Sequence, residues 1–150
     1  MSIQKKLTEL TAKTGALEST DVLVISDYNG ATYDTKKITG SQIVPYKVYI
    51  TKISQTGTAA PTVTGGYSQL TGTLTFARSS AGVYSITNSV AEFTANNVFI
   101  FLQSGVGAGL AFYQVEYVNT TLLNLYTFNF SGVAADALLL NSSLEIKIIN

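Results

Sequence analysis

Residues 143–149 read SLEIKII, an alternation that is typical of a β-strand with one buried face. Successive side chains of a strand point in opposite directions, so Leu144, Ile146 and Ile148 would face a core and Glu145 and Lys147 would face solvent. Residues 110–118, LAFYQVEYV, alternate in the same way, with Ala111, Tyr113, Val115 and Tyr117 opposite Gln114 and Glu116. Both segments predict half-buried antiparallel strands.

Further β-prone runs extend this pattern through residues 46–150. Turn-rich segments containing Gly, Asn, Ser or Pro separate the runs at intervals of about ten residues. The predicted strands are Lys47–Ser54, Leu70–Ala77, Gly82–Asn88, Asn97–Gln103, Leu110–Val118, Leu122–Phe130 and Ser143–Ile149. The fold class is therefore all-β, with an antiparallel β-sandwich or jelly-roll-like domain over residues 46–150.

The predicted strand Leu122–Phe130 is apolar on both faces. Leu123 and Leu125 share one face, and the opposite face carries Leu122, Tyr126, Phe128 and Phe130. A strand of this kind needs cover on both sides. The second cover could be a loop, a second sheet or a neighbouring subunit, and the sequence leaves these alternatives open.

Residues 1–45 form a separate, more polar region. Ile3, Leu7 and Leu10 lie on one stripe of a short helix, which Gly15 would end. The segment Thr20–Ile43 then contains a β-prone run and the turn signal Asn29-Gly30. We expect a short helix followed by a β-hairpin, which together look more like an attachment element than a catalytic one.

Charge is scarce and unevenly placed. Charged residues make up 12% of the chain, the net charge is zero, and ten of the eighteen lie within the first 43 residues. A neutral chain gives no electrostatic reason to expect nucleic acid or an anionic membrane as a partner. A weakly charged surface also resists association poorly, which favours an oligomer over a monomer coated with Thr and Asn.

The residues that most catalytic sites require are absent. The chain has no His and no Cys, which excludes catalytic triads, thiolate chemistry and His-based metal sites. The carboxylates of the β domain are Glu92, Glu116, Asp136 and Glu145. The stretch Gly105–Gly109 lacks the spacing of a phosphate-binding loop and is expected to connect two strands. We therefore expect no enzyme, no metal and no cofactor.

Nine Tyr and seven Phe supply many aromatic rings. The flat face of an exposed ring could stack on a sugar. The strand positions of Phe76, Phe99, Phe101, Phe112, Phe128 and Phe130 favour a place in the core instead. Tyr67 and Tyr84 lie near turns, which makes them the candidates for ligand contact at the surface.

Two parts of the sequence resemble proteins of tailed bacteriophages. Residues 20–27 (TDVLVISD), 35–39 (TKKIT) and 42–43 are similar to a segment common in phage fibre and spike proteins. Residues 53–62, 77–84, 93–97 and 143–150 look like a small β domain of phages that infect Bacteroidetes-type bacteria. In those phages the domain is found on virion proteins such as head fibres or vertex spikes.

The resemblance implies a structural virion protein, made in the bacterial cytoplasm and carried on the particle. It implies a trimer whose region 1–45 docks on a capsid or tail protein and whose β domain projects outward for host attachment. Candidates for docking are Asp21, Asp27, Lys36 and Lys37. It supplies no catalytic residue, and no nucleic acid or membrane insertion is expected. The alternative is a carbohydrate-binding module that recognises surface glycan.

Overall fold

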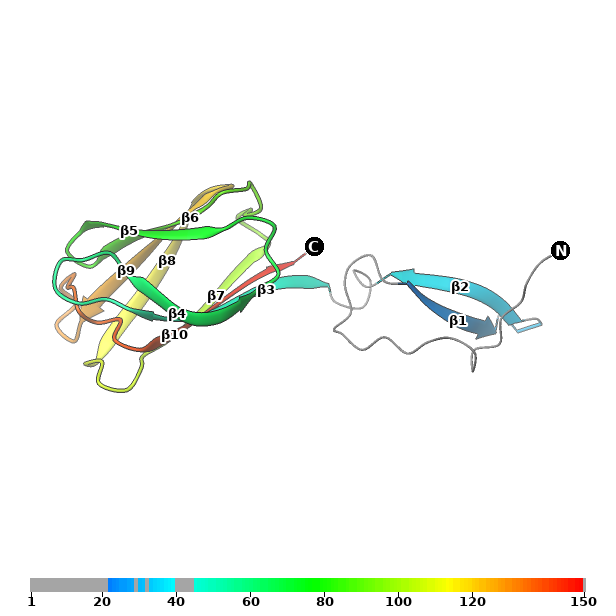
Figure 1. Ribbon diagram of the computed structural model, residues 1–150, viewed down its shortest axis with the longest axis horizontal. Helices are drawn as coiled ribbons and strands as arrows, with labels where there is room; N and C mark the ends of the chain where they lie inside the picture. Colours follow the sequence, from blue (N-terminus) through cyan, green and yellow to red (C-terminus); the bar gives the residue numbers. More distant parts are fainter. Residues whose placement is uncertain (1–21, 29, 32, 40–44, 150) are drawn as a thin grey trace. The chain divides into compact units, whose positions relative to one another are not determined.

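The computed structural model describes residues 22–28, 30–31, 33–39 and 45–149, and every regular element among them is a β-strand. The chain divides at Pro45 into two compact units, residues 1–45 and 46–150. Figure 1 shows the strands of both units. The predicted helix around Ile3, Leu7 and Leu10 lies outside the described residues.

The first unit contains a β-hairpin. Strand β1 (Val22–Tyr28) pairs antiparallel with β2 (Tyr33–Thr39), in a register that runs from Val22 opposite Thr39 to Tyr28 opposite Tyr33. Gly30 in the connecting loop has a φ of 93°, a conformation that glycine adopts without steric cost. The hairpin predicted from the turn signal is confirmed.

The second unit consists of eight strands in two antiparallel sheets. Their bounds are β3 Tyr46–Ser54, β4 Thr62–Ser68, β5 Leu74–Ser80, β6 Val83–Asn88, β7 Val98–Gln103, β8 Ala111–Asn119, β9 Leu122–Asn129 and β10 Ser142–Ile149. One sheet, here called the β3 sheet, has the order β4-β3-β10-β7, and the other, the β9 sheet, has the order β5-β6-β9-β8. The all-β prediction is therefore confirmed.

The inner faces of the two sheets supply the hydrophobic core. Leu144 and Ile146 of β10 and Leu123 and Leu125 of β9 are fully buried, together with Phe93 from a loop. Burying one such side chain contributes about 1.5–3 kcal/mol relative to leaving it in water. The alternation predicted for residues 143–149 and 110–118 is confirmed, because Leu144 and Ile146 face inward and Gln114 and Glu116 are exposed.

The two ends of the sandwich differ in what they carry. Tyr46, the first residue of β3, lies opposite Ile149, the last residue of β10, so both strands have these termini at one end, the Tyr46 end (Figure 1). The opposite end, the loop end, carries the connections that follow β3, β5, β7 and β9, which are residues 55–61, 81–82, 104–110 and 130–141. The chain from the first unit therefore joins the sandwich at the end away from these four loops.

Strand β4 was not expected from the sequence. The stretch TVTGGYS reads as a turn because of its two glycines, yet it pairs with β3 along an edge of the sheet. All seven of its residues are exposed, so no hydrophobic pattern marks it. Gly66 has a φ of 133°, and a Cβ there would lie 2.4 Å from the carbonyl oxygen of Ile50. Glycine is therefore required by the close approach of the two strands at an irregularity in their register.

Candidate functional site

Glu92 links three segments by hydrogen bonds at the Tyr46 end, namely β3, residues 71–72 and the end of β6. Its carboxylate accepts a hydrogen bond from Lys47 Nζ at 2.6 Å, from Asn88 Nδ2 at 2.9 Å, and from the backbone N–H groups of Thr71 and Gly72. Burial raises the pKa of Glu92, but these donors outweigh it and lower the pKa to about 2. Because residues 71–72 are held in this way, the strand predicted from Leu70 begins only at Leu74.

Asp136 links residues of β5, β6 and the turn between them by hydrogen bonds at the loop end. Arg78 donates from Nε at 3.1 Å and from Nη2 at 2.7 Å, and the Tyr84 hydroxyl and the Gly82 N–H also donate to this carboxylate. The hydrogen bond from Arg78 is the main cause that holds the pKa of Asp136 well below its usual range. Burial, reinforced by Asp136, raises the pKa of Tyr84 well above its usual range.

These two acids do not form a catalytic pair. Glu92 is bound at the Tyr46 end and Asp136 at the loop end, so they lie at opposite ends of the sandwich. Within the described ranges, no group of three or more Asp, Glu, His or Cys residues is placed to hold a metal ion. Each carboxylate therefore has a structural role: it links segments of the chain, and neighbouring hydrogen-bond donors satisfy it.

Four aromatic rings form a continuous group on the outer face of the β9 sheet, here called the aromatic platform. It consists of Phe112, Tyr126, Phe128 and Phe130. Phe112 lies directly opposite Phe128 in the register of β8 and β9. The Phe112 and Phe130 rings are nearly parallel at 6.4 Å, and those of Tyr126 and Phe128 at 6.5 Å. Phe112 is 57% and Phe130 74% exposed, so the platform is open to solvent.

A set of polar side chains continues the platform along the same strands. The Tyr126 hydroxyl donates to Glu116 Oε2 at 2.6 Å, and Asn124 Nδ2 lies 3.4 Å from the same oxygen. These donors lower the pKa of Glu116, so that its carboxylate stays ionised. Gln114 lies opposite Tyr126 and is exposed. Stacking surfaces and hydrogen-bonding groups therefore stand side by side on one face.

The outer face of the β3 sheet is also apolar, with a different distribution of charge. One row of direct register neighbours crosses all four strands, from Tyr67 through Ile50 and Glu145 to Phe101. Ile50, Phe101 and Glu145, with Gln103 and Ser143, line a shallow hollow of about 530 Å³. Lys147 pairs with Glu145 at 3.1 Å and lies 5.5 Å from the Phe101 ring centroid. The charges of Lys147 and Glu145 therefore neutralise each other within the face.

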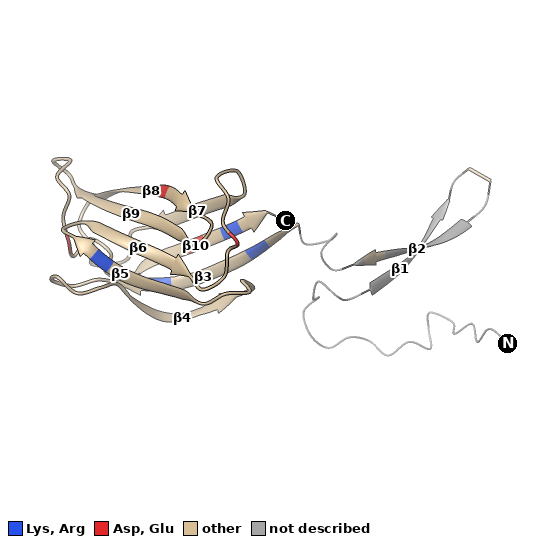
Figure 2. Ribbon diagram, turned by 90° about the horizontal axis from the view of Figure 1, so that it is seen from above, with Lys and Arg blue, Asp and Glu red and all other residues tan. Residues whose placement is uncertain are grey.

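Charge is sparse over the whole second unit, as Figure 2 shows. Its eight charged residues include three ion pairs, which are Lys47 with Glu92, Arg78 with Asp136, and Lys147 with Glu145. Among the described residues, Lys52 and Glu116 take part in no ion pair. The four strands of the β9 sheet carry two charged residues, Glu116 and Arg78. Arg78 lies opposite the buried Tyr84 and is bound to Asp136, so Glu116 is the one charged side chain on the exposed face of this sheet.

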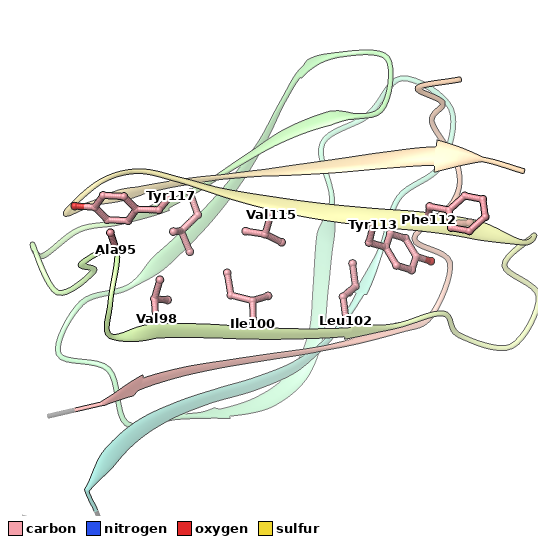
Figure 3. Close-up of a pocket in the computed structure, with 10 residues that line it drawn as sticks. Ala95, Val98, Ile100, Leu102, Phe112, Tyr113, Val115 and Tyr117 are labelled. Atoms are coloured by element: carbon pink, nitrogen blue, oxygen red, sulfur yellow. The ribbon is translucent and has the colours of Figure 1, made fainter. Parts of the chain in front are cut away.

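A groove of about 590 Å³ opens between the edge strands β7 and β8. Figure 3 shows Val98, Ile100 and Leu102 of β7 pointing toward Tyr113, Val115 and Tyr117 of β8. These side chains are half-buried and continue the core to the open side of the sandwich. The Tyr113 hydroxyl donates to the Leu138 carbonyl at 3.0 Å, which fastens a loop to this wall.

The described docking candidates lie on the hairpin of the first unit, and the predicted ligand contacts lie on two strands of the second unit. Asp27 lies on β1 opposite Asp34, while Lys36 and Lys37 lie on β2 opposite Ile25 and Val24. Asp21 lies outside the described residues. Tyr67 is 52% exposed on β4, as expected for a surface position.

Tyr84 was wrongly assigned to the surface. It is fully buried in β6, and its hydroxyl donates a hydrogen bond to Asp136 Oδ1. A buried phenol needs such a partner, and this one is 52 residues away in the sequence. Tyr84 cannot contact a ligand in this fold.

Four of the six phenylalanines expected in the core are exposed instead. Phe99, Phe101, Phe112 and Phe130 all have large accessible fractions, while Phe76 and Phe128 are half-buried. Residues 98–103, VFIFLQ, are apolar on both faces of a strand, so alternation alone does not say which face turns inward. The signal that could have found these surfaces is the excess of apolar residues on the second face of the strands around 99–101 and 122–130.

No family model matches the chain, and neither a curated protein nor a solved structure matches it. The part of the chain that the structure describes contains no helix long and apolar enough to cross a membrane.

Proposed function

We propose that this chain is a structural protein of a bacteriophage virion, a spike or head fibre that acts by binding and not by catalysis. Residues 1–45 would dock on a capsid or tail protein, with Asp21, Asp27, Lys36 and Lys37 as candidate contacts. The β-sandwich would project from the particle and serve host attachment. The short helix predicted near Ile3 and the jelly-roll-like strand path stay predictions within this proposal.

The observation that carries the proposal is the amount of apolar surface that the sandwich exposes. Thirteen large hydrophobic residues of the described part are exposed, including Ile50, Tyr67, Phe99 and Phe101 on the outer face of the β3 sheet. Soluble monomers seldom expose wide contiguous apolar patches, which usually mark sites of association. A protein that works as several copies on a particle accounts for this surface.

The outer face of the β3 sheet is the better candidate for contact between copies. Its carboxylate, Glu145, is paired with Lys147, so covering the face leaves no unpaired carboxylate there, and the remaining charge is the cation Lys52. The face also includes Tyr46 and Ile149, at the end where the chain from residues 1–45 joins the sandwich. Three copies with these faces turned toward a common axis would place their Tyr46 ends together at one end and their loop ends at the other.

Native mass spectrometry of the full chain tests the assembly. We expect a species of three times the 16.0 kDa chain mass at micromolar concentration. A stable monomer at these concentrations contradicts the trimer. Peptide mapping of purified virions, with immunogold labelling of the sandwich, tests the location. Absence of the chain from intact particles contradicts the virion role, whatever its oligomeric state.

One observation favours a second candidate function, a carbohydrate-binding module. The aromatic platform is exposed beside hydrogen-bonding side chains on a flat sheet face. The two functions are compatible, because a spike that attaches to a host can bind glycan through the same domain.

A further inference from the structure

We propose that the outer face of the β9 sheet binds a neutral pyranose glycan, with sugar rings stacked on the aromatic platform and hydroxyl groups bound by Gln114, Glu116 and Asn124. The inference deepens the attachment role proposed above. It concerns residues of β8, of β9 and of the position just after β9 (Phe130), none of which is the predicted ligand contact Tyr67 or Tyr84.

The platform offers the stacking half of such a site. Aromatic faces carry partial negative charge and attract the partially positive C–H groups on the flat side of a pyranose. The Phe112 and Phe130 rings lie 23° from parallel, and those of Tyr126 and Phe128 lie 16° from parallel. Phe112 and Phe128 are direct neighbours across the two strands, so the two ring pairs join. The platform can thus contact more than one sugar of a chain.

The neighbouring polar groups offer the hydrogen-bonding half. Glu116 accepts through Oε2 from Tyr126 and Asn124, while no described residue donates to its other oxygen, Oε1. An ionised carboxylate only accepts hydrogen bonds, which suits the donor hydroxyls of a sugar. The Gln114 side chain, which can both donate and accept, makes no hydrogen bond with another described residue and is exposed.

Charge selects a neutral glycan over an acidic one. Glu116 and Arg78 are the charged residues on the four strands of this sheet, and Arg78 is bound to Asp136. An acidic sugar would meet the Glu116 carboxylate with no free cation on these strands to compensate it.

The same carboxylate argues against a second copy as the occupant of this face. Two copies meeting through it about a two-fold axis would bring two Glu116 side chains toward each other. Covering an ion without a partner is costly. A hydroxyl-rich ligand instead supplies donors to the carboxylate while its C–H faces cover the rings.

Binding is tested with the full chain by isothermal titration against neutral hexasaccharides. The set comprises glucose, mannose, galactose, xylose and N-acetylglucosamine oligomers, with a hexagalacturonate as the acidic member. At least one neutral oligomer should bind, and the hexagalacturonate should not. Phe112→Ala and Phe130→Ala should each weaken binding at least about tenfold, as expected for removal of an aromatic anchor.

A matched control lies on the other sheet. Phe99→Ala removes a ring of similar exposure from the outer face of the β3 sheet and should leave the affinity within about twofold. Unfolding curves of all variants show whether each is folded. Glu116→Gln keeps the shape but removes the charge, so it should weaken neutral binding several-fold and preserve the fold.

Three outcomes overturn the proposal. The first is no binding of any neutral member at millimolar concentration, and the second is preference for hexagalacturonate. The third is conversion of an oligomer to a monomer by Phe112→Ala, which makes the platform an interface between copies. A chain found on virions as a trimer that binds no glycan keeps the virion role and loses this inference, so the two failures are distinct.

Discussion

The two outer faces of the sandwich are similar in apolar content and different in how they treat charge. The β3 sheet pairs its carboxylate, Glu145, with Lys147 at 3.1 Å beside Phe101, and the charge left on its face is the exposed cation Lys52. The β9 sheet leaves Glu116 with hydrogen-bond donors but no cation. A face whose carboxylate already has a cation can be covered by another protein surface without leaving that carboxylate unpaired. A face with an unpaired carboxylate is better suited to a ligand that brings hydroxyl groups.

The largest expected effect comes from placing a charge on the face proposed for association. Phe101→Glu should weaken assembly on the order of a thousandfold, since it would cover a second carboxylate next to Glu145 with Lys147 as the one described cation beside the two. The measurement is sedimentation equilibrium across a concentration series. Phe112→Glu on the β9 sheet is the matched control and should leave the mass unchanged. Equal dissociation by both variants would remove the distinction between the faces.

The next effect concerns the core that carries both faces. Leu125 is fully buried on the inner side of β9, with Tyr126 pointing outward beside it. Leu125→Ala should lower the free energy of unfolding by about 2–5 kcal/mol, because it removes apolar contacts and leaves a cavity. Val118→Ala, on the exposed edge strand β8, should change it by less than about 1 kcal/mol. Denaturant titration of both variants makes the comparison, and similar losses would show that the inner face of the β9 sheet is no better packed than its outer face.

Acid should weaken the contacts of the two carboxylates, Glu92 and Asp136, at the ends of the sandwich. The pKa of Glu92 is about 2 in the folded chain against an ordinary 4.5, and the pKa of Asp136 is also lowered. The stability from these groups is therefore present above about pH 4.5 and is lost as the pH falls toward 2. Melting temperatures between pH 6 and pH 2 should fall in this window, and Glu92→Gln should show a shallower fall. A wild-type melting temperature that stays constant to pH 2 would contradict the role of these contacts.

The smallest expected effect tests the polar edge of the aromatic platform. Tyr126→Phe keeps the ring and removes the hydroxyl that donates to Glu116 at 2.6 Å. The pKa of Glu116 should rise toward its ordinary value, while stability changes by less than about 0.5 kcal/mol because the pair is at the surface. Carboxyl NMR titration follows the pKa. An unchanged Glu116 pKa would show that this hydrogen bond does not set the charge of the face.

The strands with a clear alternation were predictable from the sequence. In residues 143–149, charged residues mark the outer face, so the direction of each side chain follows from the pattern. The exposed strand β4 had no such pattern, and its two glycines gave a turn signal. Tyr84 was misplaced because its burial depends on Asp136 and Arg78, which are brought to it only by the folded chain.

The candidate binding faces were beyond prediction for a related reason. Phe99 and Phe101 alternate with Val98, Ile100 and Leu102, so two apolar faces compete for one core. The pairing of β7 with β10 decides between them, since Ile146, which is fully buried, lies opposite Ile100. The sequence leaves a neighbouring subunit open as cover for residues 122–130, but the ring stacking with Phe112 depends on the register of β8 and β9, which the sequence does not contain.

The pairing of β3 with β10 has a consequence for how the chain is synthesised. These are the first and last strands of the second unit, yet they lie next to each other in the middle of one sheet. On the ribosome, β3 and β4 can form a hairpin early, but β7 has no partner in this sheet until β10 has emerged. The nascent chain must therefore carry an incomplete core until residues 142–149 have been made, a stage at which exposed apolar strands are prone to aggregate. A stop codon shortly before Ser142 would remove the centre of the sheet, and the remaining strands could not close the sandwich.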